Sequence, residues 1–562
     1  MSKPTKTALQ RMRTLLQQRH AATRIDRRFK STPAPATATE TKDDQGGGAT
    51  GRSVDGGHGK KNLDDIPGPS GLPYVGSMLK YRLGTPGIDG MKDILTDHYH
   101  KYGGLVSEKV AGKTRVHVFD PEHVKDVYRQ EGKWPLIEPL VETTQLFREH
   151  FQHSPGLGNT NGNEWYRMRS GVHQLMMRPK EVAAYLPLVD DVAKDFVNHL
   201  DDVTDSEHHI KDLTMDVAKW NLENSANIAM EERKNFFTTN SEKAEKWIEA
   251  QTAIMREAGL LRYALPWYRF MPTPKWKNLV KAEEYLTSEC QKMVEDALGR
   301  LKAADERHSH EDHEFRFLRG LQASSVLNNK DIVTLVLSLM TDGLPSTAPT
   351  VLSILYCLAT NPAQQDRLRD DVNSLSSLDE PLTNEAINKM TYLKACIKET
   401  LRLFPVTLEI SRVCPTDMTV GDYVLPEGTC LKINNFVAHR DPTYFPDPDT
   451  FHPERWLRHT REELEAQREE SSSGQGAGQP ISVKEGGESS SDLTNHPYRF
   501  IPFGHGPRMC PGRRIAEQDL QAVTARLVQK FHVQWHGGTM GQRWETLMKP
   551  DCPLDFTFHA RG

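Results

Sequence analysis

Residues 503–514 read FGHGPRMCPGRR, and the interpretation of the whole sequence starts from this short loop. Its single thiol, Cys510, is flanked by residues with special backbone behaviour. Glycine lets the backbone approach a bulky flat ligand and adopt positive φ, whereas proline fixes the chain and removes an amide. The pattern predicts a rigid loop that presents one cysteine to a ligand, and the residues responsible are Gly504, Gly506, Pro507, Pro511 and Gly512.

The residues after the loop place Cys510 at the start of a helix. The stretch from Arg513 to Phe531 has apolar residues at helical spacing, which predicts an amphipathic helix. The partial positive charge at a helix N-terminus favours a thiolate over a thiol. A thiolate donates electron density to haem iron, so Cys510 is a candidate iron ligand. A lone cysteine is more commonly a buried, inert thiol.

Composition restricts the class of protein. The chain has 562 residues, 37% of them hydrophobic and 26% charged, which is enough for a large folded core. The net charge of -5 argues against nucleic acid as the main partner. The 7 cysteines are scattered and form no CxxC pair. That usage is typical of a reducing compartment and excludes the usual cysteine-rich zinc spacings.

The N-terminal region and one internal segment differ in composition from the rest. Residues 1–30 hold nine Lys or Arg and one acid, Asp26, without an apolar segment. Such a composition resembles an organellar transit peptide, although a disordered basic tail has the same composition. Residues 31–63 and 462–494 are low-complexity and are predicted to be disordered. We therefore expect a transit peptide and linker at 1–63 and one folded domain at 64–562, with a disordered loop inserted at about 462–494.

Apolar spacing predicts a mainly α fold with small β-sheets. Strands are expected within Leu105–Phe119 and Met418–Asn434, where apolar and polar residues alternate in short runs. No run of about 18 apolar residues exists, so no membrane-spanning helix is predicted. The expected helices are Glu181–Leu200, Glu242–Arg256, Lys275–Ala303, Asp331–Ala359, Pro362–Leu375 and Asn384–Leu403.

Three further motifs carry charged or aromatic side chains at fixed spacing. The run KETLR places Glu399 and Arg402 on one side of a helix, and FHPERW supplies Arg455. The run WYRMR contains Trp165 and Arg169, and ISRV contains Arg412. Each motif alone is more often an ordinary surface or packing feature.

Together, these motifs resemble the cytochrome P-450 superfamily of haem-thiolate monooxygenases. The loop matches the superfamily pattern FxxGxRxCxG, and KETLR and WYRMR match its ExxR and WxxxR patterns. The resemblance covers most of residues 64–562. It implies the helix-rich fold of that superfamily, a haem b cofactor, and a structural triad of Glu399, Arg402 and Arg455. The cofactor contacts that it implies are Cys510 as the metal ligand, with Arg508, Trp165, Arg169, Arg412 and Phe503.

Within the superfamily, the sequence resembles the mitochondrial class. The stretches LKACIKETLRLFPV, FPDPDTFHPERWL and RMCPGRRIAE carry this resemblance. It implies electrons from NADPH through a ferredoxin reductase and an iron–sulfur ferredoxin, and a place on the matrix face of the inner mitochondrial membrane. A solvated basic face is the plainer explanation for the implied partner contacts, which are Lys394, Lys398, Arg513 and Arg514.

The resemblance to the mitochondrial class implies a lipophilic substrate, such as a sterol. The segment 260–272, LLRYALPWYRFMP, is aromatic and basic without acids. Such a segment suits peripheral contact with a membrane surface, and core packing would explain it as well.

The sequence departs from the superfamily over the central helix, where residues 339–350 read LMTDGLPSTAPT. The superfamily normally carries an acid and an alcohol here that pass protons to bound oxygen. Pro345 occupies the acid position and Ser346 the alcohol position. Proline kinks a helix, so the widened turn is expected to persist. Ser346 or Thr347 is predicted to hydrogen-bond to dioxygen, and Asp342 to act through water.

This departure leaves two alternatives open. One is a haem-thiolate isomerase or dehydratase that needs no electrons. The other is a non-catalytic haem-binding carrier or sensor. The basic positions implied for ferredoxin favour a redox enzyme, because neither alternative needs an electron donor.

Overall fold

The computed structural model describes residues 60–72, 75–83, 87–306, 315–457 and 496–561. Residues 1–59 of the predicted transit peptide and linker lie outside the described residues, as does the predicted loop insertion. The chain divides into two compact units. The main unit comprises Lys61–Leu265 and Thr273–Gly562, and the other contributes Lys60 and Pro266–Pro272 to the described residues.

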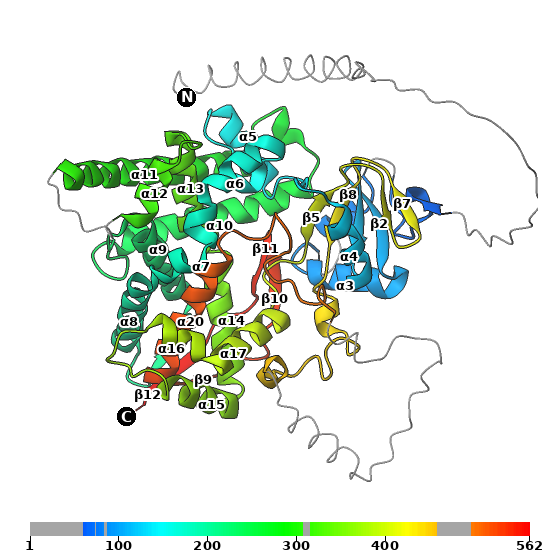
Figure 1. Cartoon of the computed structure of the whole chain (residues 1–562). Helices are drawn as coiled ribbons and strands as arrows, with labels where there is room; N and C mark the ends of the chain where they lie inside the picture. Colours follow the sequence, from blue (N-terminus) through cyan, green and yellow to red (C-terminus); the bar gives the residue numbers. More distant parts are fainter. Residues whose placement is uncertain (1–59, 73–74, 84–86, 307–314, 458–495, 562) are drawn as a thin grey trace, which may run out of the picture. The chain divides into compact units, whose positions relative to one another are not determined.

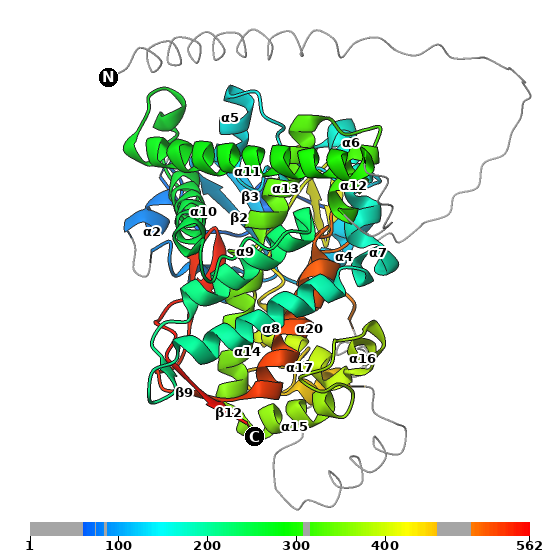
Figure 2. The ribbon, with the colours of Figure 1, turned by 90° about the vertical axis from the view of Figure 1, so that its left-hand side faces the viewer.

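The main unit is built mostly from helices, which group on one side of the unit in Figure 1, while the four-stranded sheet lies on the other. This confirms the predicted mainly α class. Figure 2 shows α8 and α20 crossing below α9. The helices that matter for the site are α4 (Pro121–Gln130), α6 (Gly162–Met177), α8 (Leu186–Val203), α9 (Thr214–Met230), α13 (Asn329–Asp342), α14 (Thr347–Ala359), α17 (Thr391–Leu403) and α20 (Arg513–Lys530).

Helix α9 lies in the middle of the core and is buried on all sides from Val217 to Met230. A helix that is apolar on one stripe only would expose its other face, so the polar residues of α9 need partners. Glu223 has them: its carboxylate accepts hydrogen bonds from the Arg233 side chain and from the backbone amides of Lys234 and Phe236. These bonds fasten the chain that leaves α9.

A four-stranded sheet has the order β2-β3-β8-β5. The predicted strand Leu105–Phe119 is a hairpin of β2 (Leu105–Val110) and β3 (Lys113–Val118). Its turn residues Ala111 and Gly112 both have positive φ, as a tight hairpin turn requires. Strand β8 (Cys430–Ile433) pairs parallel with β3. Strand β5 (Ile410–Val413) pairs antiparallel with β8.

Three smaller sheets complete the main unit. One has the order β1-β7-β6, and its strands are β1 (Lys61–Asn62), β7 (Tyr423–Leu425) and β6 (Met418–Val420). The folded part therefore includes Lys61, three residues before the expected start. The other two sheets contain β4 (His209–Ile210), β9 (Phe531–Trp535), β10 (Gln542–Glu545), β11 (Leu547–Pro550) and β12 (Phe556–Ala560).

Three of the predicted helices are divided in the structure. Glu181–Leu200 corresponds to α7 (Pro179–Ala183) and α8. Asn384–Leu403 corresponds to α16 (Asn384–Lys389) and α17, which are separated at Met390. The predicted central helix Asp331–Ala359 is divided into α13 and α14 by residues 343–346, which include Pro345. The remaining predicted helices appear as α10 (Ser241–Arg262), α11 (Pro274–Glu306) and α15 (Pro362–Asn373).

The segment Pro266–Pro272 of the second unit contains the short helix η3 (Trp267–Arg269). Its aromatic and sulfur-containing side chains Trp267, Phe270 and Met271 are exposed. These three residues are therefore not packed in the core, which was one of the two expectations for this segment. Among the helices that the structure describes, none has the length and apolar composition needed to cross a membrane.

A buried ion pair joins α8 to α20. Arg526 donates from Nε to Asp190 Oδ1 (2.7 Å) and from Nη2 to Asp190 Oδ2 (2.8 Å). It also donates to backbone carbonyls of the segment 377–380. Both members of the pair are buried, so Arg526 depends on Asp190 for compensation of its charge. Lys194 is a second, more distant cation beside Asp190, at 3.8 Å from Oδ2.

We expect Arg526→Met to lower the free energy of unfolding by about 3–5 kcal/mol, because it removes the buried guanidinium that makes two hydrogen bonds to the buried Asp190 carboxylate. The partly exposed Lys194, whose Nζ lies 3.8 Å from Asp190 Oδ2, is too distant to replace those two bonds. Urea denaturation followed by circular dichroism measures the change. Lys302→Met is the control, since Lys302 is exposed and lies 4.0 Å from Glu306, and such pairs contribute about 0–1 kcal/mol. Equal effects of the two substitutions would contradict the prediction.

Candidate active site

Cys510 lies at the end of a tight loop that leads into α20. Its backbone amide donates to the Phe503 carbonyl at 2.9 Å and closes the loop. Gly504 and Gly506 both have a φ of 73°, a conformation that residues with a Cβ atom rarely adopt. The two glycines are therefore required by the backbone, as the sequence predicted.

The Cys510 thiol is desolvated by the surrounding protein, yet the residue as a whole is exposed. Burial raises the pKa of the Cys510 thiol, and the nearby Asp342 carboxylate adds to this effect. The amides of Gly512 and Arg513 at the start of α20 act in the opposite direction, but burial prevails. The predicted thiolate therefore requires more than the helix start, namely a bound cation. A residue that is surrounded by protein and still has accessible surface lines an internal space.

Several partners outside the loop hold the side chain of Arg508. It donates from Nε to the Pro135 carbonyl (3.0 Å) and from Nη2 to the Thr160 carbonyl and Asn161 Oδ1 (both 2.7 Å). Its guanidinium lies over the Trp165 ring, 4.2 Å from the centroid. The WYRMR and FGHGPR motifs are thus in direct contact.

Two more arginines reach the same loop from other elements. Arg169 on α6 donates from Nη2 to the Met509 carbonyl (3.0 Å). Arg412 on β5 donates from Nη2 to the His505 carbonyl (3.3 Å). Arg412 also donates from Nε to Glu131 Oε2 (2.5 Å). We call Arg169, Arg412 and Arg508 the arginine cluster.

The arginine cluster carries uncompensated positive charge. Burial lowers the pKa of Arg508 to about 9, and repulsion by Arg412 and Arg169 contributes. Glu131 is the carboxylate that acts on Arg508 from the opposite side. Three guanidiniums and one carboxylate leave an excess of two positive charges. This excess would balance the two negative charges of the propionate groups of haem b. The cluster, the loop and its single sulfur therefore fit this cofactor.

The central helix is interrupted beside this loop. Pro345 has no amide hydrogen, and the regular bonding pattern fails around it. The Ser346 hydroxyl donates to the Asp342 carbonyl at 2.7 Å. The Ala348 amide donates to the Gly343 carbonyl at 3.1 Å, five residues back. The expected widened turn is thus present, and it resembles a π-type bulge.

The side chains at this break differ in exposure. Thr347 begins α14 and is buried, whereas Asp342 is exposed to the internal space although burial raises its pKa to about 6. Gly343 has no room for a larger residue, because a Cβ atom there would lie 2.5 Å from Asn221 Oδ1 on α9. Asn221 was not identified from the sequence.

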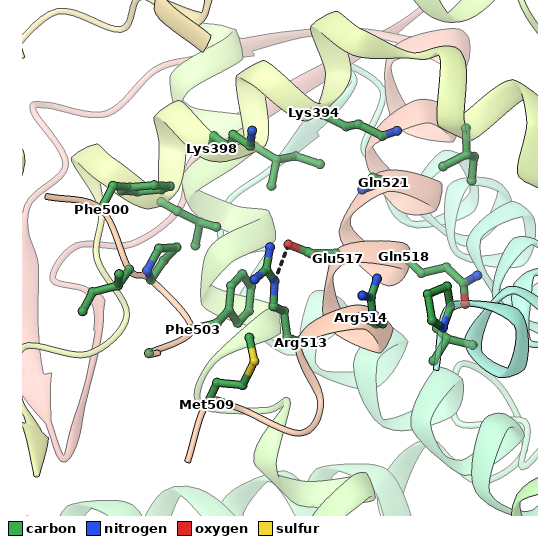
Figure 3. Close-up of a pocket in the computed structure, with 18 of the residues that line it drawn as sticks. Lys394, Lys398, Phe500, Phe503, Met509, Arg513, Arg514, Glu517, Gln518 and Gln521 are labelled. Atoms are coloured by element: carbon green, nitrogen blue, oxygen red, sulfur yellow. Dashed lines mark hydrogen bonds and ion pairs between the residues drawn. The ribbon is translucent and has the colours of Figure 1, made fainter. Parts of the chain in front are cut away.

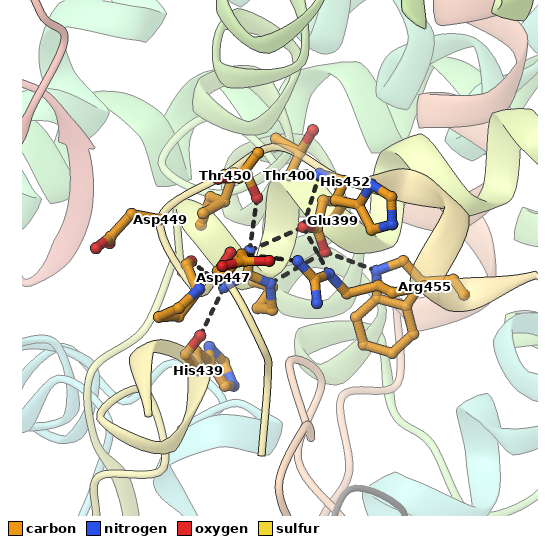
Figure 4. Close-up of polar contacts among 12 residues, drawn as sticks. Glu399, Thr400, His439, Asp447, Asp449, Thr450, His452 and Arg455 are labelled. Atoms are coloured by element: carbon orange, nitrogen blue, oxygen red, sulfur yellow. Dashed lines mark hydrogen bonds and ion pairs between the residues drawn. The ribbon is translucent and has the colours of Figure 1, made fainter. Parts of the chain in front are cut away.

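Glu399 is the centre of a polar network that Figure 4 shows. Its carboxylate accepts hydrogen bonds from Arg402 Nη2 (2.8 Å) and Arg455 Nε (3.0 Å), so the predicted triad is assembled. It also accepts from Trp456 Nε1 (2.8 Å) and from the His452 amide (3.0 Å). Burial alone would raise the pKa of Glu399, but these partners hold it below its usual value. Trp456 and His452 were not identified from the sequence.

A concave depression of about 990 Å³ lies on the outer side of the cysteine loop (Figure 3). Lys394 and Lys398 line it from α17, and Arg513 and Arg514 line it from α20. All four predicted partner-contacting residues therefore meet at one surface. The acid in its lining, Glu517, is paired with Arg513 at 3.0 Å. Phe503 lines the same depression, beneath the Arg513 guanidinium.

The comparisons with known proteins agree with this geometry. Residues 66–558 match the family model described as Cytochrome P450. The chain belongs to the cytochrome P450 family. It is therefore an oxidoreductase of the monooxygenase class that uses haem b. Among the described residues, no cluster of three or more His, Cys, Asp or Glu side chains is suited to a metal ion.

Individual P450 relatives cover most of the chain. A probable cytochrome P450, CYP44, of Caenorhabditis elegans is 35% identical over 88% of this chain and 94% of its own length. The probable mitochondrial cytochrome P450 12c1 of Drosophila melanogaster is 28% identical over 89% and 92%. The mitochondrial 1,25-dihydroxyvitamin D(3) 24-hydroxylase of Mus musculus is 27% identical over 84% of each chain.

We expect Cys510→Ser to abolish the thiolate signature in the carbon monoxide difference spectrum of the reduced, haem-loaded protein, because Cys510 is exposed in the loop whereas the other cysteines are buried or half-buried. Cys552→Ser is the control, since Cys552 is a free, half-buried thiol outside the loop. Haem content per chain is measured in parallel. An unchanged spectrum in Cys510→Ser would show that another residue binds the iron.

Proposed function

We propose that the protein is a mitochondrial-type monooxygenase that inserts one oxygen atom of O₂ into a lipophilic, sterol-like substrate. Electrons would come from NADPH through a ferredoxin reductase and an iron–sulfur ferredoxin. The observation that carries the proposal is the basic depression directly outside the cysteine loop. The mitochondrial hydroxylase and mitochondrial P450 names among the relatives support it.

The residues that would hold haem b come from three separate segments, namely the cysteine loop, α6 and β5. Cys510 would bind the iron, and the arginine cluster would bind the propionates, with Trp165 supporting Arg508 from below. Phe503 would pack beneath the loop on the side of the depression. Bound haem supplies the O₂ binding and O–O cleavage of this enzyme class. The protein fixes the cofactor, excludes water and provides protons.

The basic depression suits a small acidic protein that docks briefly. Lys398 and Arg514 are exposed, and Arg513 is partly neutralised by Glu517. Redox contacts of this kind bury little area and are steered by charge. Because exposed charges are screened within about 8 Å at physiological ionic strength, docking should weaken steeply as salt rises.

Residues at the helix break would provide the protons in place of the acid that Pro345 replaces. The Ser346 hydroxyl donates its hydrogen to the Asp342 carbonyl, so its oxygen lone pairs remain free to accept another hydrogen bond. Thr347 lies next to it at the start of α14. The Asp342 carboxyl has a pKa of about 6 and can therefore both hold and release a proton near neutral pH.

The cellular location follows from the same class. We place the protein on the matrix face of the inner mitochondrial membrane, with the basic residues 1–30 as its transit peptide. The exposed Trp267, Phe270 and Met271 would make the peripheral membrane contact. A lipophilic substrate would then be taken up from the bilayer.

Two other functions remain for the test to exclude. An isomerase or dehydratase would tolerate Pro345, because it needs no proton delivery to oxygen, and a non-catalytic carrier would too. The deciding experiment supplies the haem-loaded protein with ferredoxin, its reductase, NADPH, a sterol and lipid panel and heavy-isotope dioxygen. Labelled product establishes the monooxygenase. An unlabelled isomer favours the isomerase, and a haem that ferredoxin does not reduce favours the carrier.

We expect Lys398→Glu combined with Arg514→Glu to raise the KM for ferredoxin by on the order of tenfold, because two attractive charges become repulsive. The kcat at saturating ferredoxin and the affinity for substrate should stay unchanged. Steady-state turnover at several ionic strengths measures this. Lys302→Glu, at an exposed position on α11, is the control. An equal rise in the control would contradict the docking surface.

The pH profile tests Asp342. Because burial raises its pKa to about 6, its acid form predominates below that pH and is lost above it. We expect the product formed per NADPH consumed to fall as pH rises through this range. Asp342→Asn should give a lower ratio that does not vary with pH, whereas Asp97→Asn, at an exposed site on α3 (Met91–Tyr102), should behave as wild type. A wild-type profile in Asp342→Asn would exclude this role.

A further inference from the structure

The carboxylate of Glu131 occupies an unexpected place within the arginine cluster. Glu131 follows the last residue of α4 and is 5% exposed, and Arg412 is 3% exposed. Arg412 Nε donates to Glu131 Oε2 at 2.5 Å. A site built only to attract anions would leave Arg412 free. Here a protein carboxylate uses part of its guanidinium.

Neighbouring residues fix the contact between Glu131 and Arg412 from both sides. The backbone of the cysteine loop passes directly over the carboxylate, since a Cβ atom at Gly506 would lie 2.6 Å from Glu131 Oε1. On the opposite side, the guanidinium of Arg412 lies over the Tyr128 ring, 5.1 Å from its centroid. Glu131 is therefore held between the loop and a fixed arginine.

Keeping this carboxylate charged is unfavourable on its own. Burial raises the pKa of Glu131, although Arg412 and Arg508 oppose the rise. Buried charges persist where they compensate one another. Glu131 lowers the net charge of the cluster from three positive charges to two. The two haem propionates carry two negative charges, which would balance them. Without Glu131, the occupied site would keep one positive charge that nothing balances.

We propose that Glu131 is a positioning residue that matches the charge of the arginine cluster to the two haem propionates and thereby holds down the haem reduction potential. The proposal rests on the proposed role of the cluster as the propionate site. Reduction of the iron adds one negative charge. An unbalanced positive charge nearby favours the reduced form, and buried charges are screened little by salt.

The test is a redox titration of the haem-loaded protein and three variants, Glu131→Gln, Arg412→Gln and the double variant. Glu131→Gln leaves three positive charges, so the ratio of reduced to oxidised haem at a fixed potential should rise by roughly threefold or more. Arg412→Gln leaves one, and the ratio should fall by a similar factor. The double variant restores two charges, and its ratio should return to the wild-type value.

Two further variants serve as controls. Glu138→Gln removes a half-buried carboxylate that pairs with Lys432 at 2.8 Å, and it should leave the ratio unchanged. Glu131→Asp keeps the charge and should also leave it unchanged. If Glu131→Gln retains no haem, the comparison uses haem content, which the double variant should regain.

Several results would overturn the proposal. One is a double variant that stays at the value of Glu131→Gln, or that fails to regain haem, because the double variant has the same net charge of two as the wild-type cluster. Another is a Glu131→Gln ratio equal to that of Glu138→Gln. If Arg412→Gln shifts the ratio and Glu131→Gln does not, the propionate assignment stands and only the role of Glu131 fails. If neither shifts it, both fail.

Discussion

The buried carboxylate of Glu399 holds together the part of the molecule that carries the cysteine loop. It joins α17 to the segment around Arg455, and Arg402 extends the network to the carbonyls of His439, Pro448 and Thr450. Two aromatic side chains then connect this network to the cysteine loop. Trp456, which donates to Glu399, packs on Phe500 with centroids 4.7 Å apart, and Phe500 precedes the loop by three residues. A buried charge with complete hydrogen bonding is rigid, so this network fixes the approach to Cys510.

Charge is arranged differently on the two sides of the cysteine loop. On the inner side, Arg169 and Arg412 are buried and Arg508 is half-buried. Burial lowers the pKa of Arg508 to about 9, and repulsion within the cluster contributes. On the outer side, the lysines and arginines of the depression are mostly exposed. Buried charge binds a permanent ligand tightly, because little solvent competes with it. Exposed charge attracts a partner that must leave again. In our proposal, the loop thus separates a cofactor site from a docking surface.

The break in the central helix shows how one substitution is accommodated by several residues. Pro345 removes an amide, Ser346 supplies a hydroxyl to the Asp342 carbonyl, and the amide of Ala348 bonds five residues back. Asn221 on α9 packs against Gly343 from behind. The widened turn therefore persists in a P450 without the usual acid. What changes is the proton donor, which in our proposal becomes Asp342.

Local sequence was sufficient for features that depend on neighbouring residues in the chain. The glycines of the FGHGPRMCPGRR loop, the helix that follows Cys510 and the kink at Pro345 all reflect backbone preferences. The residues of the ExxR, WxxxR and ISRV motifs were found because their spacing resembles that of a known superfamily. The division of the predicted helices near Ala184 and Met390 was missed, since apolar spacing continues across both positions.

Other features depend on residues that are distant in the sequence, and only the tertiary structure decided them. Glu131 meets Arg412 across 281 positions of the chain, and no local pattern marks that pair. The same holds for Trp456 on Glu399 and Asn221 behind Gly343. The pKa of Cys510 is also a tertiary property, because burial outweighs the helix start that the sequence displays. Spacing along the chain determines backbone conformation, whereas the compensation of buried charge depends on which elements the fold brings into contact.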